Sequence, residues 1–297
     1  MTSPRSKRNQ LNAYMLLMPS MVTLILIVFF PILYVAFLSF SGFTYGQRTG
    51  FIGLRNYLYI FTDPLFFTSL KATVIFTFWS VIGQATLAII FATAINAAGK
   101  GESGIRLAVI MPYMVSMVAG GVTFRWMLNT EFGIVNYLLL SMKIVDNPVN
   151  FLGIPSLAMA SIVIAHLWSS TPFATLILLA GLKSISTEIY ESAEIDGAGF
   201  FRKFFSITIP LIKPQILIVM LIQTMFAFRE FALPFSMTGG GPGVTTKLLA
   251  MLLKEKMTYL DFGYNSALSV IMMVITLLVA LVYLKMMAEP AARNEGS

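Results

Sequence analysis

Six apolar runs dominate the sequence, and each is close to the length that crosses a lipid bilayer. A helix needs about 20 apolar residues to span the hydrocarbon core. Hydrophobic residues make up 57% of the chain and charged residues only 11%, whereas a soluble domain usually carries about 25% charged residues. The sequence therefore predicts an all-α integral membrane protein with about six transmembrane helices. The predicted spans are 15–38, 70–97, 105–128, 157–180, 214–237 and 263–287.

Basic residues in the segments between the spans predict the orientation, because cytoplasmic loops are enriched in Lys and Arg. If the N-terminus is cytoplasmic, segments 1–14 and 289–297 are cytoplasmic tails on a permease domain of residues 15–288. The last outer loop opposes this bias with Lys247, Lys254 and Lys256. The inner segments hold Arg5, Lys7, Arg8, Lys100, Arg106, Lys183, Arg202, Lys203, Lys213, Lys285 and Arg293. Because these basic residues are scattered among loops, the net charge of +7 does not indicate nucleic-acid binding.

The inner segment 183–213 is too strongly patterned for a simple linker. Ser186 can cap a helix that ends at Asp196-Gly197, since this pair tolerates the positive φ angles of a turn. A second short helix, rich in phenylalanine, is expected to stop at Pro210. The pattern predicts a helix-turn-helix projection at the inner face of the membrane. A pair of interfacial helices resting on lipid is the alternative that the residues leave open.

Residues 191–200, followed by Ile209-Pro210-Leu211, closely resemble the EAA loop of type I ABC importer permeases. The sequence departs from that motif only at Ser192, where the family usually has alanine. The segments Phe51–Tyr57, Trp168–Leu182 and Thr238–Pro242 are similar to stretches of the carbohydrate-importer branch, the MalF-like permeases. The resemblance covers nearly the whole chain and implies the type I permease fold with a cytoplasmic coupling loop.

The resemblance also implies a role for this loop and a set of partners. In the family the loop enters a groove on the ATP-hydrolysing subunit, and its glutamate, here Glu191, meets a basic residue there. The coupling residues carried over are Glu191, Ser192, Ala193, Asp196, Gly197, Ala198 and Phe200. The implied assembly contains a second homologous permease subunit, two copies of the ATPase and an extracytoplasmic solute-binding protein, in a bacterial inner (plasma) membrane.

The chain itself is not expected to be an enzyme. Neither Gly99-Lys100 nor the cluster Gly239–Gly243 has the spacing of a phosphate-binding loop, so ATP and Mg²⁺ are expected in the partner ATPase. With no cysteine and one histidine, the options for a nucleophile or a metal site are few. We expect no catalytic residue, no metal and no cofactor in this chain.

Polar residues inside two spans mark a candidate solute path, because such groups usually face a bundle interior or a water-filled cavity. Alignment with the sugar-contacting positions of MalF-like permeases implies His166, Ser169, Ser170, Phe173, Phe226, Ala227 and Glu230. Aromatic faces beside hydrogen-bonding groups suit a sugar. Whether His166, Arg229 and Glu230 contact the solute or only pack between helices stays open.

Two functions are consistent with these residues and motifs. The first is a permease subunit that forms half of the path for a sugar or sugar-like solute. The second is a self-sufficient, ion-coupled secondary transporter, which would need carboxylates in the membrane and commonly carries internal repeats. Glu230 is the one clear carboxylate candidate, and the sequence shows no repeat. The solute stays open among sugars, glycosides, polyols and glycerol phosphate.

Overall fold

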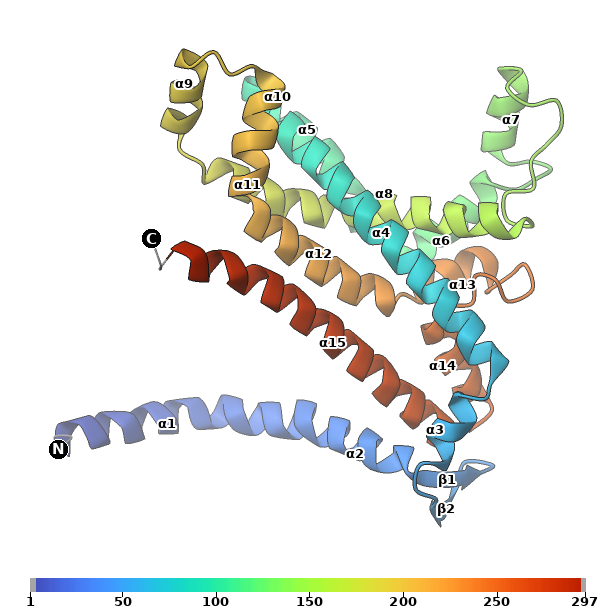
Figure 1. The fold of residues 1–297 in the computed structure, drawn as a ribbon. Coiled ribbons are helices and arrows are strands. Elements are labelled where there is room, and N and C mark those ends of the chain that lie inside the picture. Colours follow the sequence, from blue (N-terminus) through green and yellow to red (C-terminus); the bar gives the residue numbers. More distant parts are fainter. Residues whose placement is uncertain (1–3, 295–297) are drawn as a thin grey trace. The chain divides into compact units, whose positions relative to one another are not determined.

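The fold is described from a computed structural model, which covers residues 4–294, with side chains for 14–99 and 101–288. The predicted tails 1–14 and 289–297 therefore lie almost wholly outside the described side chains. The chain forms two compact units (Figure 1). The first runs to Asp63 and includes Leu253–Val274, and the second comprises Pro64–Leu252 and the chain from Ile275 onward.

Four helices in the described residues are long and apolar enough to cross a membrane, and six spans result if each of two bent helix pairs is one span. The first covers Tyr14–Ser39 in the first unit. It consists of α1 (Pro4–Leu24), the π-helical turn η1 (Ile25–Phe29) and α2 (Phe30–Ser39). The other three helices are Pro64–Ala97, Pro155–Lys183 and Phe262–Ala288.

The first unit also holds a β-hairpin that the sequence analysis did not predict. Strand β1 (Ser41–Thr44) pairs antiparallel with β2 (Gln47–Phe51). Tyr45 and Gly46 between them have φ angles of 52° and 79°, as a tight two-residue hairpin turn requires. Helix α3 (Arg55–Ile60) follows the hairpin. The start of α15 (Phe262–Asn294) packs nearby, and the Tyr264 hydroxyl donates to Asp63 Oδ2 at 3.0 Å.

The second unit is built on three packed helices, α4 (Pro64–Ala97), α8 (Pro155–Lys183) and α12 (Lys213–Phe228). Small residues let these helices approach closely, as is common between helices in lipid. A Cβ atom at Gly83 of α4 would lie 2.8 Å from Leu167 Cδ1 of α8. An apolar cluster between the three helices contains Ala88, Ala92, Ile95, Ala174, Leu178, Leu179, Leu182, Ile212 and Val219.

The predicted third span, 105–128, is not one continuous helix. Helix α5 (Glu102–Ile110) and the 3₁₀ turn η3 (Met111–Met114) meet α6 (Met117–Met127) at a bend of 94°. Pro112 has no N–H for a helical hydrogen bond, and Val115 is extended, with φ −83° and ψ 131°. These two residues break the span. The loop that follows α6 contains α7 (Ile134–Ser141).

The predicted fifth span, 214–237, is also interrupted. Helix α12 ends at Phe228, and α13 (Ala232–Thr238) begins after a three-residue break. Phe231 leaves the helical region with φ −131°, and Pro234 lacks the N–H that would bond to the carbonyl of Glu230. Arg229 and Glu230 therefore lie in the break and not in a regular membrane helix. Helix α14 (Leu249–Thr258) follows α13.

Candidate functional site

The first candidate site is the coupling loop, residues 183–213, which contains α9 (Thr187–Ile195) and α10 (Phe200–Lys203). Helix α9 begins where the sequence predicted. The Ser186 hydroxyl accepts a hydrogen bond from the Glu188 backbone N–H at 3.3 Å, which satisfies one of the free donors of the first turn. The Glu188 carboxylate lies in that first turn, where the helix dipole favours negative charge.

The end of α9 is fixed by backbone geometry. Gly197 has a φ of +75°, a conformation that costs residues with a Cβ atom free energy. The N–H of Ala198 donates to the Ala193 carbonyl and the N–H of Gly197 donates to the Glu194 carbonyl, each at 2.9 Å. This pair of bonds is a Schellman motif, which closes the helix and turns the chain. The turn predicted at Asp196-Gly197 is therefore present.

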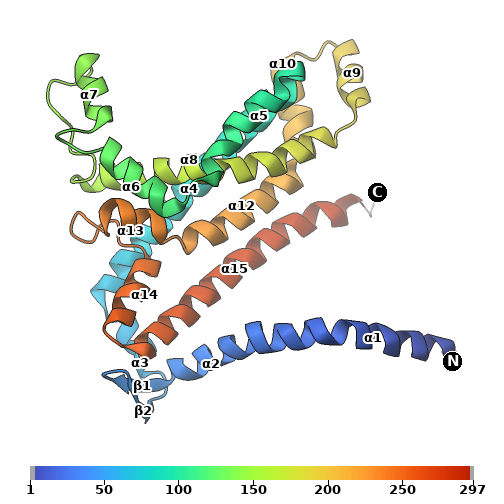
Figure 2. The ribbon, with the colours of Figure 1, turned by 180° about the vertical axis from the view of Figure 1, so that it is seen from behind.

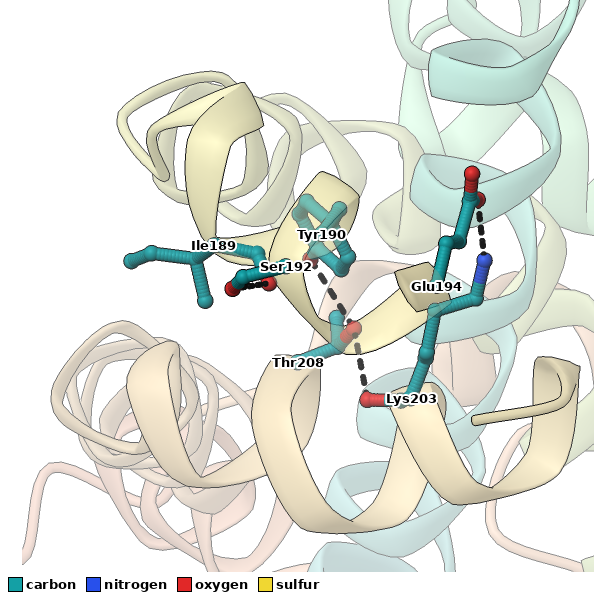
Figure 3. Close-up of polar contacts among 6 residues, drawn as sticks. All are labelled: Ile189, Tyr190, Ser192, Glu194, Lys203 and Thr208. Carbon is teal, nitrogen blue, oxygen red and sulfur yellow. Dashed lines mark hydrogen bonds and ion pairs between the residues drawn. The ribbon is translucent and has the colours of Figure 1, made fainter. Parts of the chain in front are cut away.

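Side-chain contacts tie α9 to the helix after the turn (Figure 3). Lys203 Nζ lies 2.5 Å from Glu194 Oε1. The Thr208 hydroxyl donates to the Lys203 carbonyl at 3.3 Å, so the Tyr190 hydroxyl, 2.9 Å away, is the donor to Thr208. The Ser192 hydroxyl donates to the Ile189 carbonyl within α9. These contacts therefore join the two arms of the loop.

The expectation that Pro210 stops the second helix is wrong. Helix α10 continues into a π-helical turn, η4 (Phe204–Thr208), and then into α11 (Ile209–Leu211), which contains Pro210. Because a π turn bonds residues five apart, it changes the local register and leaves room for a residue without an N–H. The chain breaks only at Ile212, before α12 begins.

The coupling loop exposes large apolar side chains beside acidic ones. Ile195 is 87% exposed, Phe201 73%, Phe205 64% and Phe200 63%. Of the other predicted coupling residues, Glu191, Ser192, Asp196 and Gly197 are exposed, and Ala193 and Ala198 are half-buried. Exposed large apolar side chains of this kind, where they gather on one surface, commonly mark an interaction site.

The coupling loop and α7 lie at opposite ends of the second unit, as both ribbon views show (Figures 1 and 2). Helix α8 joins the two ends, and its 29 residues are about 43 Å long at 1.5 Å per residue, enough to cross the bilayer. At the coupling-loop end, Lys183 forms an ion pair with Glu102 at the start of α5. This contact holds the base of the loop against the rest of the unit.

The second candidate site is a cavity of about 390 Å³ in the second unit, which we call the solute cavity. Its lining comes from η3 and the start of α6, from α8, and from α12 and the break that follows it. It brings together five of the seven predicted path residues. The lining residues are Tyr113, Met117, His166, Ser170, Phe173, Gln223, Phe226, Arg229 and Glu230.

Three aromatic rings form one wall of the solute cavity. The rings of Tyr113 and Phe173 are stacked with centroids 6.0 Å apart, and Phe226 is tilted against Phe173 at 6.5 Å. Polar groups of the lining come from the same segments of the chain as these rings. Gln223 Nε2 donates to the Ser170 carbonyl at 3.4 Å, and Glu230 Oε1 accepts from the Leu233 N–H at 3.1 Å. The cavity thus combines an apolar face with hydrogen-bonding groups.

Two predicted path residues do not line the solute cavity. Ala227 is fully buried in an apolar cluster with Phe76 and Leu233. Ser169 is buried, and its hydroxyl lies 3.1 Å from the His166 carbonyl, to which it donates, and 3.4 Å from Met117 Sδ. Both residues support the wall from behind.

The sequence does not predict three of the lining residues, Tyr113, Met117 and Gln223, and it leaves the role of Arg229 open. Gln223 and Arg229 carried a usable signal, since both are polar residues within a predicted span. Tyr113 and Met117 carried no such signal in the sequence, because only the bend between α5 and α6 places them at the cavity.

A larger hollow of about 710 Å³ between α4 and α8 is a poor candidate for a polar solute. Its lining is almost wholly apolar, including Trp79, Met159 and Leu167, with Lys71 as the one charged lining residue. Its few polar side chains, Thr68, Lys71, Ser156 and Thr245, would leave most hydroxyl groups of a sugar without partners, and those groups would lose free energy on leaving water. The smaller cavity is therefore the better solute site.

Comparisons with known proteins agree with the resemblance seen in the sequence. The family model described as "Binding-protein-dependent transport system inner membrane component" matches residues 101–288. The sulfoquinovosyl glycerol transport system permease protein SmoG of Agrobacterium fabrum is 36% identical over 286 residues, covering 93% of this chain and 90% of that protein. The trehalose/maltose transport system permease protein MalF of Thermococcus litoralis is 35% identical and covers 96% of each.

A solved structure has the same fold. A chain of the bacterial alginate ABC transporter, solved in complex with an alginate pentasaccharide-bound periplasmic protein, superposes with a TM-score of 0.80 at 20% identity and covers 94% of each chain. The predicted type I permease fold is thereby confirmed, and so is the predicted relationship to the MalF-like permeases. The same relationship favours the importer subunit over the ion-coupled secondary transporter. The chain therefore belongs to the family of binding-protein-dependent transport system inner membrane components, as a membrane-spanning permease subunit of an ABC importer.

Proposed function

We propose that this chain forms half of the path for a sugar or sugar-like solute, and that the coupling loop transmits the force of ATP hydrolysis to the helices of that path. The other half would come from a second homologous permease. Two copies of an ATPase, which bind ATP and Mg²⁺, and an extracytoplasmic solute-binding protein complete the assembly. The observation that carries the proposal is the coupling loop itself, a rigid and exposed projection joined directly to α8 and α12.

The chemistry of the coupling loop suits a docking role. Ile195, Phe200 and Phe201 expose large apolar side chains, which bind well when they enter a groove on a partner. Glu191 is exposed on α9, and we assign its carboxylate to a basic residue of the ATPase. Because Lys203 and Thr208 hold the two arms together, a displacement of the loop is passed to α12 as a rigid-body movement.

The lining of the solute cavity supports a sugar as the solute. Tyr113, Phe173 and Phe226 offer ring faces to the apolar face of a pyranose. Gln223, Ser170 and Glu230 offer hydrogen-bond partners to hydroxyl groups. The relatives SmoG and MalF, described as sulfoquinovosyl glycerol and trehalose/maltose permeases, support the same class.

The substitution Glu191→Lys tests the coupling role. The chain, tagged in its native membrane, would be purified with its partners, and ATP hydrolysis and ATP-driven solute uptake would be measured in vesicles. We expect Glu191→Lys to abolish uptake or to release the ATPase, because it places like charges at the contact. Glu131→Lys is the matched control, since Glu131 is an exposed carboxylate in the loop before α7, at the other end of the unit. Normal uptake by Glu191→Lys would contradict the assignment.

We also propose that both termini and the coupling loop are cytoplasmic. The basic residues Arg106, Lys183, Arg202, Lys203 and Lys213 belong to segments at the coupling-loop end, as the positive-inside rule expects. The chain has no cysteine, so single-cysteine variants can be labelled cleanly. A membrane-impermeant maleimide should label Tyr137→Cys in intact cells and Ser103→Cys only after permeabilisation. The reverse labelling pattern would show that the coupling loop lies outside the cytoplasm and would contradict this orientation.

A further inference from the structure

One basic side chain faces the solute cavity, and its position is fixed. Arg229 lies in the break between α12 and α13, and its Nε donates to the Met225 carbonyl at 3.1 Å. This bond holds one edge of the planar guanidinium. The two terminal nitrogens have no hydrogen bond or ion pair to any side chain or backbone group that the structure describes. An arginine held in this way presents a free pair of N–H donors.

The neighbouring carboxylate does not neutralise Arg229. Glu230 Oε1 accepts from the Leu233 N–H at 3.1 Å, so the carboxylate is directed to the first turn of α13. Backbone donors at the start of a helix stabilise a negative charge. Within the described part of the chain, no ion pair joins Glu230 to Arg229. Each charge is therefore available to a different part of a solute.

His166 also lines the solute cavity, and both of its imidazole nitrogens are buried. The side chain is 1% exposed, and neither imidazole nitrogen has a hydrogen-bond partner among the described residues. Its ring is held edge-on against Phe76 at 5.1 Å. A buried polar group without a partner costs free energy, so a solute that accepts a hydrogen bond from His166 recovers part of that cost.

The cavity therefore sorts its groups by chemistry. The rings of Tyr113, Phe173 and Phe226 form the apolar wall. The carboxylate of Glu230 can accept hydrogen bonds from hydroxyl groups. The N–H groups of Arg229 and His166 need hydrogen-bond acceptors. Guanidinium groups pair with carboxylate, sulfonate and phosphate oxygens through two parallel N–H donors. A neutral sugar could offer the guanidinium of Arg229 only hydroxyl oxygens, which form weaker hydrogen bonds than charged oxygens do.

We propose that the solute is an acidic sugar or glycoside, with a carboxylate, sulfonate or phosphate group that is bound by Arg229 and a pyranose ring that stacks on the aromatic wall. This inference rests on the proposed function, since it takes the cavity to be part of the solute path. It assigns Arg229 as the residue that sets the charge preference of that path.

The test compares acidic and neutral probes of one shape. The tagged complex, purified with its partners and held in lipid nanodiscs, is titrated by saturation-transfer NMR with methyl β-D-glucuronide against methyl β-D-glucoside, with the corresponding galacto pair, and with glucose 6-sulfate and glucose 6-phosphate against glucose. We expect at least one acidic probe to bind about tenfold more tightly than its neutral partner, as a charge-assisted hydrogen bond allows.

Variants of Arg229 decide whether this residue is the cause. Arg229→Gln should remove the preference and Arg229→Lys should keep part of it, because lysine retains the charge but not the fork. Arg125→Gln should change nothing, since Arg125 is an exposed arginine on α6 that does not line the cavity. Equal binding of every pair, no binding of any acidic probe, or an unchanged preference in Arg229→Gln would each overturn the inference. ATP hydrolysis by the same complex and its loss in Glu191→Lys report on the proposed function separately.

Discussion

The coupling loop and the solute cavity are built in opposite ways. The coupling loop is one continuous segment, and its shape is set by bonds between residues a few positions apart, such as Ala198 N–H to the Ala193 carbonyl. The cavity is assembled from three segments, around Tyr113, His166 and Phe226, that are far apart in the sequence. Backbone conformation therefore controls the loop, whereas side-chain packing between helices controls the cavity.

The two regions also differ in what they leave unsatisfied. The loop exposes apolar side chains such as Ile195 and Phe201 to the surroundings of the chain. The cavity is lined by polar groups without partners among the described residues, namely the buried nitrogens of His166 and the terminal nitrogens of exposed Arg229. Exposed apolar side chains suit a protein partner, and polar groups without hydrogen-bond partners suit a polar solute. Mutations in the loop should therefore affect coupling, and mutations in the cavity should affect the affinity for solute.

After Glu191→Lys, the largest effect is expected from Gly197→Val in the loop. A β-branched residue at a φ of +75° is strained by about 1–3 kcal/mol, so the turn should reopen and the docking surface should lose its shape. ATP-driven uptake by the purified complex should fall by more than about tenfold, since tenfold corresponds to about 1.4 kcal/mol, while the amount of chain in the membrane stays unchanged.

Gly199→Val is the matched control for that substitution. A Cβ atom at either glycine meets nothing within 4 Å, so the two sites differ in backbone conformation and not in space. Gly199 is extended, with φ −70° and ψ 173°, a region that valine adopts readily. Uptake should stay above about half of the wild-type rate, because strain of this kind is absent. Equal losses in the two variants would show that the positive φ is not what holds the loop.

The loop could be predicted from the sequence because its signals are local. The cap at Ser186 and the positive φ at Gly197 follow from residue types that act within one helical turn. Pro210 shows where such reasoning fails. A proline was expected to end the helix, but the preceding π turn at Phe204–Thr208 shifts the register and the helix continues to Leu211. That turn depends on packing that the local sequence does not report.

The cavity could be predicted only in part, and the errors follow the helical geometry. Adjacent helical residues point about 100° apart, so one step separates Ser170, which lines the cavity, from Ser169, which packs behind it. The same step separates Phe226 from buried Ala227. Which of two neighbours faces the cavity is decided by the packing of α8 against α4 and α12. The bend in the third span and the break after α12 add lining residues that no periodicity indicates.

A smaller effect is expected in the cavity, where Phe173→Ala would sharpen the comparison. Phe173 is the central ring of the wall, in contact with both Tyr113 and Phe226. An aromatic pair contributes about 0.5–1.5 kcal/mol beyond the area it buries, so the solute concentration for half-maximal uptake should rise about two- to tenfold. The maximal rate should change little, because the coupling loop is untouched.

Ser169→Ala tests two assignments of Ser169 against each other. The structure places this residue behind the cavity wall, whereas the sequence alignment places it at the solute. If Ser169 only supports the wall, the substitution removes a bond to the His166 carbonyl and leaves the lining intact. Half-maximal uptake should then stay within about twofold of wild type, because the net contribution of one such bond is about 0.5–1.5 kcal/mol to stability and none of it is made to solute. A rise in Ser169→Ala as large as that in Phe173→Ala would mean that the α8 face turned toward the solute differs from the one seen here, and the cavity would have to be redrawn around Ser169 and Ala227.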